Sequence, residues 1–421
     1  MNEKIPKKAI VIGAGIAGLS VAIRLQNEGF QVAVFESNEY PGGKLTDLSK
    51  EGYRFDMGPS LFTMPQFVEE LFTVSKKNIK DYFSYKKKET VCHYFYKDGT
   101  TFKALSDVNK FARSAAKTFD VDEDELVNYF QKSKKKYELT SSLFLEKSLH
   151  KLSTYFSKDT LTAVFNVNSL DINTTLHDYN TDCFKDSRLV QLFDRYATYN
   201  GSSPYQTPGI MSMIPHLEQY YGTFFPKGGM HSITQSIYKL AIDLGVEFNF
   251  NSKVDKIHVL DKKAIGISTN TKDYFAEYVI SNSDVVPTYR TLLKDQKSPE
   301  KTLQQPRSSS ALIFYWGIKK EFPTLDLHNI FFSDNYIQEF DYIFTKQEVY
   351  KDPTVYVNIS SKENKSDAPK GCENWFVMVN VPSNTGQDWD TIIKNVRAGV
   401  IKKISDSLNI DLEDLIEFET L

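Results

Sequence analysis

The alternation of apolar and polar residues is clearest in the first forty positions. Residues 8–12 (KAIVI) form an apolar run of mostly branched side chains, which is typical of a strand buried on both faces. After a glycine-rich turn, residues 19–29 predict a helix that stops at Gly29. Residues 31–36 then predict a second strand that ends in an acid. This order predicts the strand–turn–helix–strand unit of an α/β, Rossmann-like nucleotide-binding fold.

Hairpin and helix patterns follow. Residues 91–105 alternate apolar and polar positions around Asp98–Gly99, which predicts a β-hairpin. Residues 106–148 read as helical, with an acidic start and a basic run further along. A later helix that carries Arg195 runs into a Gly-Ser-Ser-Pro turn.

The chain then returns to long helices and strands. Gly228–Gly229 predicts a turn, and a long amphipathic helix follows it as far as Gly245. From Ser308 the sequence is rich in strands, and Asn358 is expected to face outward from one of them. Because no low-complexity linker separates these regions, we expect two interleaved domains, each built from discontinuous segments.

Composition narrows the function classes. A net charge of −3 over 421 residues gives no electrostatic case for nucleic-acid binding. The three cysteines lie far apart, so neither a zinc site nor a redox dithiol is expected, and the low, odd count fits a reducing cytoplasm. No run approaches the ~18 apolar residues that span a bilayer, so any membrane contact is expected at its surface.

The glycine-rich turn has the spacing of a dinucleotide site. Gly13, Gly15 and Gly18 stand in G-x-G-x-x-G order, which permits a tight turn, a close backbone approach to a pyrophosphate, and close packing of helix on strand. The helix N-terminus favours the phosphate charge. Glu36 ends the second strand, where it can accept hydrogen bonds from ribose hydroxyls and would repel a 2′-phosphate. NADP is therefore disfavoured, while NAD and FAD both remain open.

Two further segments favour FAD. Residues 40–45 (YPGGKL) and 52–61 (GYRFDMGPSL) resemble the continuation of this motif in FAD enzymes of the amine oxidase and phytoene desaturase superfamily. The resemblance implies that backbone N–H groups and a lysine of the first segment approach the flavin pyrophosphate, that residues 56–60 lie along the flavin, and that Val254 faces the adenine. The implied cofactor-binding residues are Gly13, Gly15, Gly18, Glu36, Gly42, Gly43, Lys44, Leu45, Gly58, Pro59, Ser60 and Val254.

The resemblance extends over most of the chain. From Lys8 to about Pro382 the sequence is similar to bacterial carotenoid desaturases. It implies an FAD-binding domain (1–88 and 224–306), a substrate-binding β-sheet domain (89–105 and 307–388) and a helical substrate- and membrane-facing region (106–223). Residues 389–421 would begin a C-terminal segment that continues beyond Leu421 in the family.

Within that family, two segments favour one branch. GGK at 42–44 and FDRYATYNGSSPY at 193–205 resemble enzymes that introduce a C3–C4 double bond at the acyclic end of a 1-hydroxylated carotenoid, such as a hydroxy-γ-carotene, by hydride transfer to flavin. Three alternatives stay open. They are desaturation of phytoene or another acyclic carotene, flavin amine oxidation, and a non-enzymatic escort protein that holds a prenyl group without flavin.

The catalytic groups themselves are not evident. The sequence has no H-E-x-x-H, G-x-S-x-G or P-loop motif, and its seven histidines are scattered, so no metal site is predicted. This fits an enzyme whose cofactor supplies the chemistry. Arg195 has two interpretations, a salt bridge with Asp194 or a residue a helical turn away, or a polar anchor for a substrate hydroxyl.

A membrane contact is also expected from the sequence. Lys132–Lys136 is either a solvated helix face or a surface that attracts anionic lipid headgroups, and residues 144–156 interleave apolar and basic side chains. With a long apolar carotenoid as substrate, this predicts a cytoplasmic protein held peripherally on the inner face of the cell membrane.

Overall fold

The chain folds into two units built from discontinuous segments. The structure, a computed structural model, describes residues 6–144, 151 and 166–421. Unit 1 comprises Met1–Lys50, Arg54–Lys86 and Phe224–Pro306, and unit 2 comprises Glu51–Tyr53, Lys87–Thr223 and Arg307–Leu421.

Unit 1 is organised around a parallel sheet. Its strands are β1 (Lys8–Ile12), β2 (Gln31–Phe35), β9 (Glu247–Asn249) and β13 (Tyr278–Ser281), in the order β13-β1-β2-β9. All three pairings are parallel. Ala9 and Val11 pack into one hydrophobic cluster while Ile10 and Ile12 pack into another. The predicted burial of this strand on both faces is therefore confirmed.

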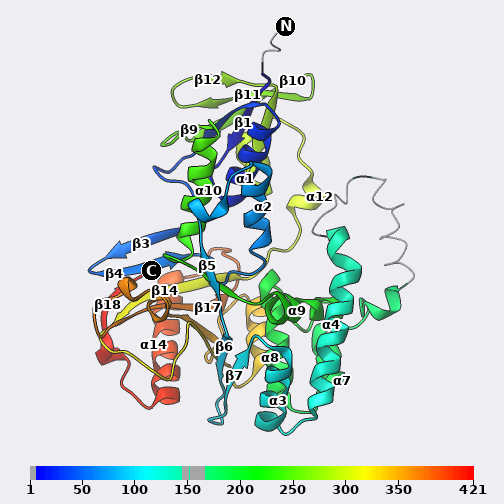
Figure 1. The fold of residues 1–421 in the computed structure, drawn as a ribbon, viewed down its shortest axis with the longest axis vertical. Helices are drawn as coiled ribbons and strands as arrows, with labels where there is room; N and C mark the ends of the chain where they lie inside the picture. Colours follow the sequence, from blue (N-terminus) through cyan, green and yellow to red (C-terminus); the bar gives the residue numbers. More distant parts are fainter. Residues whose placement is uncertain (1–5, 145–150, 152–165) are drawn as a thin grey trace. The chain divides into compact units, whose positions relative to one another are not determined.

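Different layers cover the two faces of this sheet. The first cluster is closed by helices α1 (Ile16–Asn27), α2 (Gln66–Val74) and α10 (His231–Asp243), which pack against one another (Figure 1). The second is closed by an antiparallel sheet of β10 (Val254–Leu260), β11 (Lys263–Thr269) and β12 (Asp273–Phe275). The doubly covered parallel sheet confirms the α/β fold class expected from the sequence.

Shorter elements complete unit 1. They are the strand pairs β3 (Thr46–Lys50) with β4 (Tyr53–Met57) and β5 (Tyr85–Lys87) with β8 (Phe224–Pro226), and the short helices η1 (Ile79–Asp81), α11 (Val285–Pro287), η6 (Thr288–Leu292) and α12 (Glu300–Leu303).

Unit 2 contains a seven-stranded mixed sheet in the order β18-β14-β17-β16-β15-β6-β7. Its strands are β6 (Thr90–Phe95), β7 (Thr101–Leu105), β14 (Ser310–Ile318), β15 (His328–Phe331), β16 (Val355–Asn358), β17 (Glu373–Val381) and β18 (Ile416–Thr420). Only the β6–β15 pairing is parallel within this sheet. Helix α14 (Trp389–Leu408) packs on the sheet through Val400 and Ile404.

The helical part of unit 2 has an aromatic core. Its elements are α3 (Val108–Phe119), α4 (Glu123–Phe144), η2 (Val167–Ser169), α7 (Leu176–Cys183), α8 (Ser187–Asp194), η3 (Arg195–Asn200), η4 (Gly209–Met213), α9 (Ile214–His216), η5 (Leu217–Tyr221), α13 (Tyr336–Asp341) and η7 (Tyr342–Lys346), with η8 (Ser360–Lys362), η9 (Lys365–Asp367) and η10 (Glu413–Leu415) beside the sheet. Phe111, Tyr129, Phe184 and Phe193 are buried together. None of the helices in the described ranges is long and apolar enough to cross a membrane.

The structure corrects three details of the sequence interpretation. The helical stretch 106–148 is interrupted at Asp120, whose φ of +54° ends α3. Asn358 is buried, and its side-chain amide donates to the Leu327 carbonyl oxygen at 3.1 Å. Lys136 belongs to the predicted basic face of α4 but is 2% exposed, because it binds Ser212 and Asp171. The membrane-facing stretch expected at 144–156 lies almost wholly outside the described residues.

Candidate active site

A cavity of about 1060 Å³ lies within unit 1 at the carboxyl ends of the parallel strands. Ile12 ends β1, Glu36 follows β2 and Asn282 follows β13, and all three residues line it. In open α/β sheets this edge is where ligands bind. The cavity slightly exceeds the ~300–1000 Å³ that is usual for drug-sized ligands, as a dinucleotide requires.

The first glycine turn shapes one wall of the cavity. Gly13 has a φ of +94°, a backbone conformation that favours glycine. A Cβ atom at Gly18 would lie 2.1 Å from the Gly13 carbonyl oxygen, so only glycine permits α1 to approach the turn this closely. Helix α1 begins at Ile16, which lines the cavity, and its N-terminus therefore offers a positive potential to an anion there.

Glu36 is held rigidly at the end of β2. One carboxylate oxygen accepts a hydrogen bond from the Ala14 backbone N–H at 2.8 Å, and the other accepts from the Asn38 N–H at 2.9 Å. The side chain is 6% exposed and lines the cavity. Its orientation is thus fixed by the backbone before any ligand arrives.

A second glycine turn lies directly against the first. The Gly42 N–H donates to the Ala14 carbonyl oxygen at 2.8 Å, and a Cβ atom at Gly43 would lie 3.4 Å from the Gly15 Cα. Gly42 has a φ of +114°, and a Cβ atom there would lie 2.4 Å from the Leu45 carbonyl oxygen. Two segments about thirty residues apart therefore form one cradle that has room for a ligand only because side chains are missing.

The segment 56–60 contributes through the Asp56 carboxylate and through the close packing of Gly58. Asp56 accepts hydrogen bonds from the backbone N–H groups of Met230 and His231, at the start of α10, at 2.8 and 2.9 Å. A Cβ atom at Gly58 would lie 2.1 Å from the Lys44 carbonyl oxygen, so this glycine fixes the second turn. Pro59 lines the cavity. The segment thus joins the second glycine turn to the helix that covers it.

Most residues expected at the cofactor gather in this cavity. Its lining includes Gly13, Gly15, Glu36, Gly42, Gly43, Lys44, Leu45, Pro59 and Val254. Gly18, Gly58 and Ser60 are not among the lining residues, and the first two act through close packing instead.

Asn282 is a lining residue that was not singled out from the sequence. Its side-chain amide lies 3.5 Å from the Gly13 carbonyl oxygen, and a Cβ atom at Gly15 would approach the same amide to 3.0 Å. It therefore packs directly on the first glycine turn. The available signal was its position shortly after the apolar pair Val279–Ile280.

Arg195 lies in unit 2 within a buried polar cluster. Its guanidinium donates to Glu218 at 2.8 Å and to the Tyr94 hydroxyl at 2.7 Å, and it stacks over the Tyr196 ring. Tyr196 and Tyr199 both donate to the same Glu218 carboxylate. Burial acts to lower the pKa of Arg195 and the charge of Glu218 raises it, with a net rise. The ion pair joins η3 to η5 rather than neighbouring turns of one helix.

The comparisons with known proteins agree with this geometry. Residues 16–319 match the family described as flavin containing amine oxidoreductase. The chain is also 56% identical to a 1-hydroxycarotenoid 3,4-desaturase from Flavobacterium sp. (strain P99-3), over 98% of this chain and 84% of that protein. The chain belongs to the carotenoid desaturases of the flavin-containing amine oxidoreductase family. It is therefore an FAD-dependent oxidoreductase.

More distant similarities are found to a phytoene desaturase and to the solved structure of an oxidoreductase. A phytoene desaturase from Fusarium fujikuroi is 30% identical over 99% of this chain and 77% of its own length. The crystal structure of an oxidoreductase from Methanosarcina mazei superposes with a TM-score of 0.63 at 16% identity, and covers 94% of this chain and 84% of that one. This last likeness shows a shared fold.

Proposed function

We propose that this carotenoid desaturase introduces a C3–C4 double bond at the acyclic end of a 1-hydroxylated carotenoid, such as a hydroxy-γ-carotene. The observation that carries the proposal is the 56% identity, over nearly the whole chain, to a 1-hydroxycarotenoid 3,4-desaturase. The phytoene desaturase is much less similar, at 30%. The identity to the hydroxycarotenoid enzyme therefore favours this substrate over phytoene.

The cavity of unit 1 is the proposed FAD site. Its glycine cradle and the N-terminus of α1 suit a pyrophosphate, and Glu36 offers a fixed carboxylate to ribose hydroxyls. Val254 begins β10 at the cavity wall, where its backbone is proposed to meet the adenine. Bound there, FAD would supply the hydride acceptor for an allylic C–H bond of the substrate. The protein contributes orientation and exclusion of water.

The remaining segments are proposed to serve the substrate. On this view residues 1–88 and 224–306 bind FAD, and residues 89–105 and 307–388 provide the sheet on which a long apolar carotenoid lies. Arg195 already donates to Tyr94 and Glu218, so its geometry favours the ion-pair interpretation over a substrate anchor.

The test is conversion of defined carotenoids. The chain would be expressed in bacteria that accumulate either a 1-hydroxylated carotenoid or phytoene, and the pigments separated by chromatography. We expect a product with one additional conjugated double bond from the hydroxylated substrate only. Conversion of phytoene without conversion of the hydroxylated carotenoid would reject the proposed substrate while retaining the family.

A peripheral contact with the inner face of the membrane is part of the proposal. On α4, Lys132, Lys134 and Lys135 are exposed, and the Lys134 ammonium lies 5.4 Å from the ring centre of Tyr220, which is 56% exposed. Exposed lysines on one helix, one of them beside an exposed aromatic ring, suit an anionic lipid surface, where each lysine contributes roughly 1 kcal/mol.

Vesicle sedimentation would test this contact. Replacing the three α4 lysines by Gln is expected to release the protein from vesicles that contain anionic phospholipid. The matched control replaces Lys262, Lys263 and Lys272, which are exposed in unit 1. Equal retention of the two variants would contradict a role for α4.

A further inference from the structure

A second cavity, of about 430 Å³, lies within unit 2. It is bounded by α7, α8, the segment near Tyr205 and the start of α13, and its lining includes His177, Phe184, Lys185, Val190, Asp194, Tyr205 and Tyr336. None of these residues belongs to the cavity of unit 1. Its volume falls within the range of small-molecule sites.

A buried hydrogen-bonded chain leads to the wall of this cavity. The Tyr129 hydroxyl donates to Asn180 at 2.8 Å, and the Asn180 amide donates to Asp194 at 2.8 Å. The other Asp194 oxygen accepts from His177 Nδ1 at 2.7 Å. Both oxygens of a carboxylate that is 1% exposed are thereby satisfied. The arrangement fixes the orientation of the imidazole, whose Nδ1 is committed to the protein.

The other imidazole nitrogen remains available. Among the described residues His177 Nε2 has no hydrogen-bond partner. Burial raises the pKa of the Asp194 carboxyl, and the hydrogen bond to Asp194 raises the pKa of His177. The raised pKa makes the imidazole easier to protonate, and in its protonated form Nε2–H is a charge-assisted donor.

The rest of the lining combines a second cation with aromatic surface. Lys185 is exposed at the rim, and within the described part of the chain it takes part in no ion pair. The Tyr205 ring lies 4.6 Å from the His177 ring, and Phe184 and Tyr336 are buried beside the same space. The cavity thus offers a lysine and a protonatable imidazole above an apolar floor.

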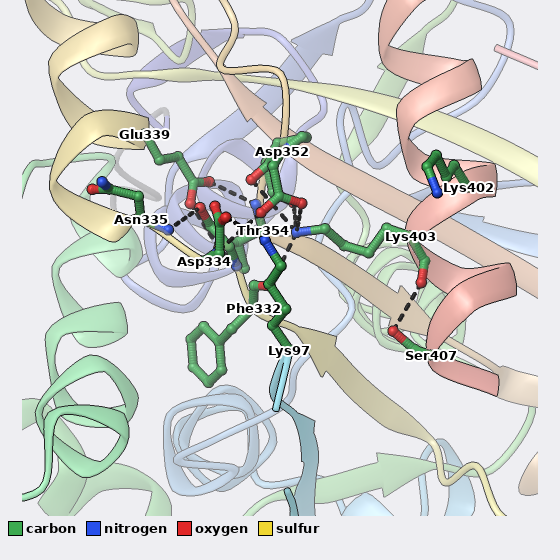
Figure 2. A network of polar contacts seen from close by, with 12 residues as sticks. Lys97, Phe332, Asp334, Asn335, Glu339, Asp352, Thr354, Lys402, Lys403 and Ser407 are labelled. Carbon is green, nitrogen blue, oxygen red and sulfur yellow. Dashed lines mark hydrogen bonds and ion pairs between the residues drawn. The ribbon is translucent and has the colours of Figure 1, made fainter. Parts of the chain in front are cut away.

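The wall formed by α13 is held in place by a separate polar network (Figure 2). Asp334 pairs with Lys97, and its backbone N–H donates to Asp352 at 2.9 Å. Glu339 accepts hydrogen bonds from both the backbone N–H and the hydroxyl of Thr354. Asp334 also lines the cavity, and its pairing with Lys97 offsets part of its negative charge there.

We propose that this cavity binds a small organic anion, in which a carboxylate or phosphate group contacts His177 Nε2 and Lys185 while an apolar body lies on Phe184, Tyr205 and Tyr336. The simpler interpretation is that the His177–Asp194 pair only ties α7 to α8. A contact that only stabilises the packing of α7 on α8 requires neither a cavity of this volume beside the imidazole nor an unpaired lysine at its rim. The two interpretations differ in whether an anion binds.

Isothermal titration of the FAD-loaded protein tests the proposal, because the cavity of unit 1 is then filled. The probes are benzoate, phenyl phosphate, inorganic phosphate and the neutral benzyl alcohol. We expect saturable binding of benzoate or phenyl phosphate at one site, and weaker binding of the alcohol by about tenfold, since a charge-assisted hydrogen bond is lost. Equal binding of inorganic phosphate and phenyl phosphate would overturn the role of the apolar floor.

Variants separate binding from helix stability. Lys185→Gln leaves the His177–Asp194 pair intact and is expected to weaken benzoate binding about tenfold without changing the melting temperature. His177→Gln should weaken benzoate binding at least as much. His258→Gln, in unit 1, is the matched control. The proposal is overturned if neither anion binds, or if both Lys185→Gln and His177→Gln bind as wild type does.

Discussion

The glycine cradle of unit 1 and the buried polar cluster of unit 2 are built in opposite ways. The cradle is made of backbone, and its glycines give it room, as at Gly18 and Gly42. The cluster around Arg195 and Glu218 is made of side chains whose charges and hydroxyls satisfy one another away from water. The cradle depends on the absence of side chains at its glycines, and the cluster depends on the mutual pairing of its side chains.

This difference predicts how each region fails. Adding atoms should damage the cradle, because a new Cβ meets backbone that has nowhere to move. Removing atoms should damage the cluster, because a buried charge left without its partner is unstable. Two substitutions test this contrast directly, and two further ones test a carboxylate of the cavity and a buried carboxyl elsewhere in unit 2.

The largest loss of stability is expected from Arg195→Met. It leaves the buried Glu218 carboxylate without its cation, which typically costs about 3–5 kcal/mol of unfolding free energy. Denaturant titration would measure it. The control is Arg113→Met, an exposed pair with Glu123, where less than about 1 kcal/mol is expected. If the loss persists undiminished in Arg195→Met/Glu218→Gln, the stranded charge is not its cause.

Gly18→Ala should remove FAD binding and lower stability by about 1–3 kcal/mol, because the new Cβ would lie 2.1 Å from the Gly13 carbonyl oxygen. Flavin absorbance of the purified protein and a melting curve give the two readouts. Gly399→Ala is the control, since a Cβ there would lie at an ordinary 3.5 Å from its nearest neighbour. A Gly18→Ala protein that is purified with full FAD occupancy would show that the cradle tolerates added atoms.

Glu36→Ala should weaken FAD binding by about tenfold, because it removes a fixed, charged hydrogen-bond acceptor from the cavity. Titration of the flavin-free protein with FAD measures the change. The exposed neighbour Glu39→Ala should bind as wild type does. Unchanged affinity in Glu36→Ala would refute the ribose-binding role.

A pH dependence of stability is expected at Glu339. Burial raises the pKa of this carboxyl from 4.5 to about 7. The folded state therefore holds the proton more tightly than the unfolded state, and this group's contribution to stability falls as pH rises from about 4.5 to about 7. Relative to Glu339→Gln, the wild type should lose unfolding free energy between about pH 5 and about pH 8. If the unfolding free energies of the two proteins change with pH in the same way, titration of Glu339 does not affect stability.

The sequence was most informative where structure depends on near neighbours. The strand at 8–12, the glycine turn and Glu36 follow one another within thirty residues, and their pattern predicted the strand and the fold class that the structure shows. The hairpin around Gly99 was predicted for the same reason. In such segments periodicity and turn chemistry carry most of the information.

Side chains with distant partners could not be predicted. Glu218 lies 23 residues beyond Arg195, and the sequence suggested Asp194 or a residue one turn away instead. Asn358 and Lys136 were expected at the surface because their local patterns are amphipathic, but Leu327 and Ser212 accept their hydrogen bonds inside the protein. These contacts exist only after tertiary packing, which overrides the local pattern.

The central claim is that the glycine cradle holds FAD for desaturation of a hydroxylated carotenoid. The most direct measurement supplies the purified, FAD-loaded protein with a 1-hydroxylated carotenoid and with phytoene in parallel, and follows the products by chromatography and absorbance. We predict an additional conjugated double bond in the hydroxylated carotenoid, and none with Gly18→Ala. A protein that cannot be loaded with FAD, or that converts phytoene and leaves the hydroxylated carotenoid unchanged, would contradict it.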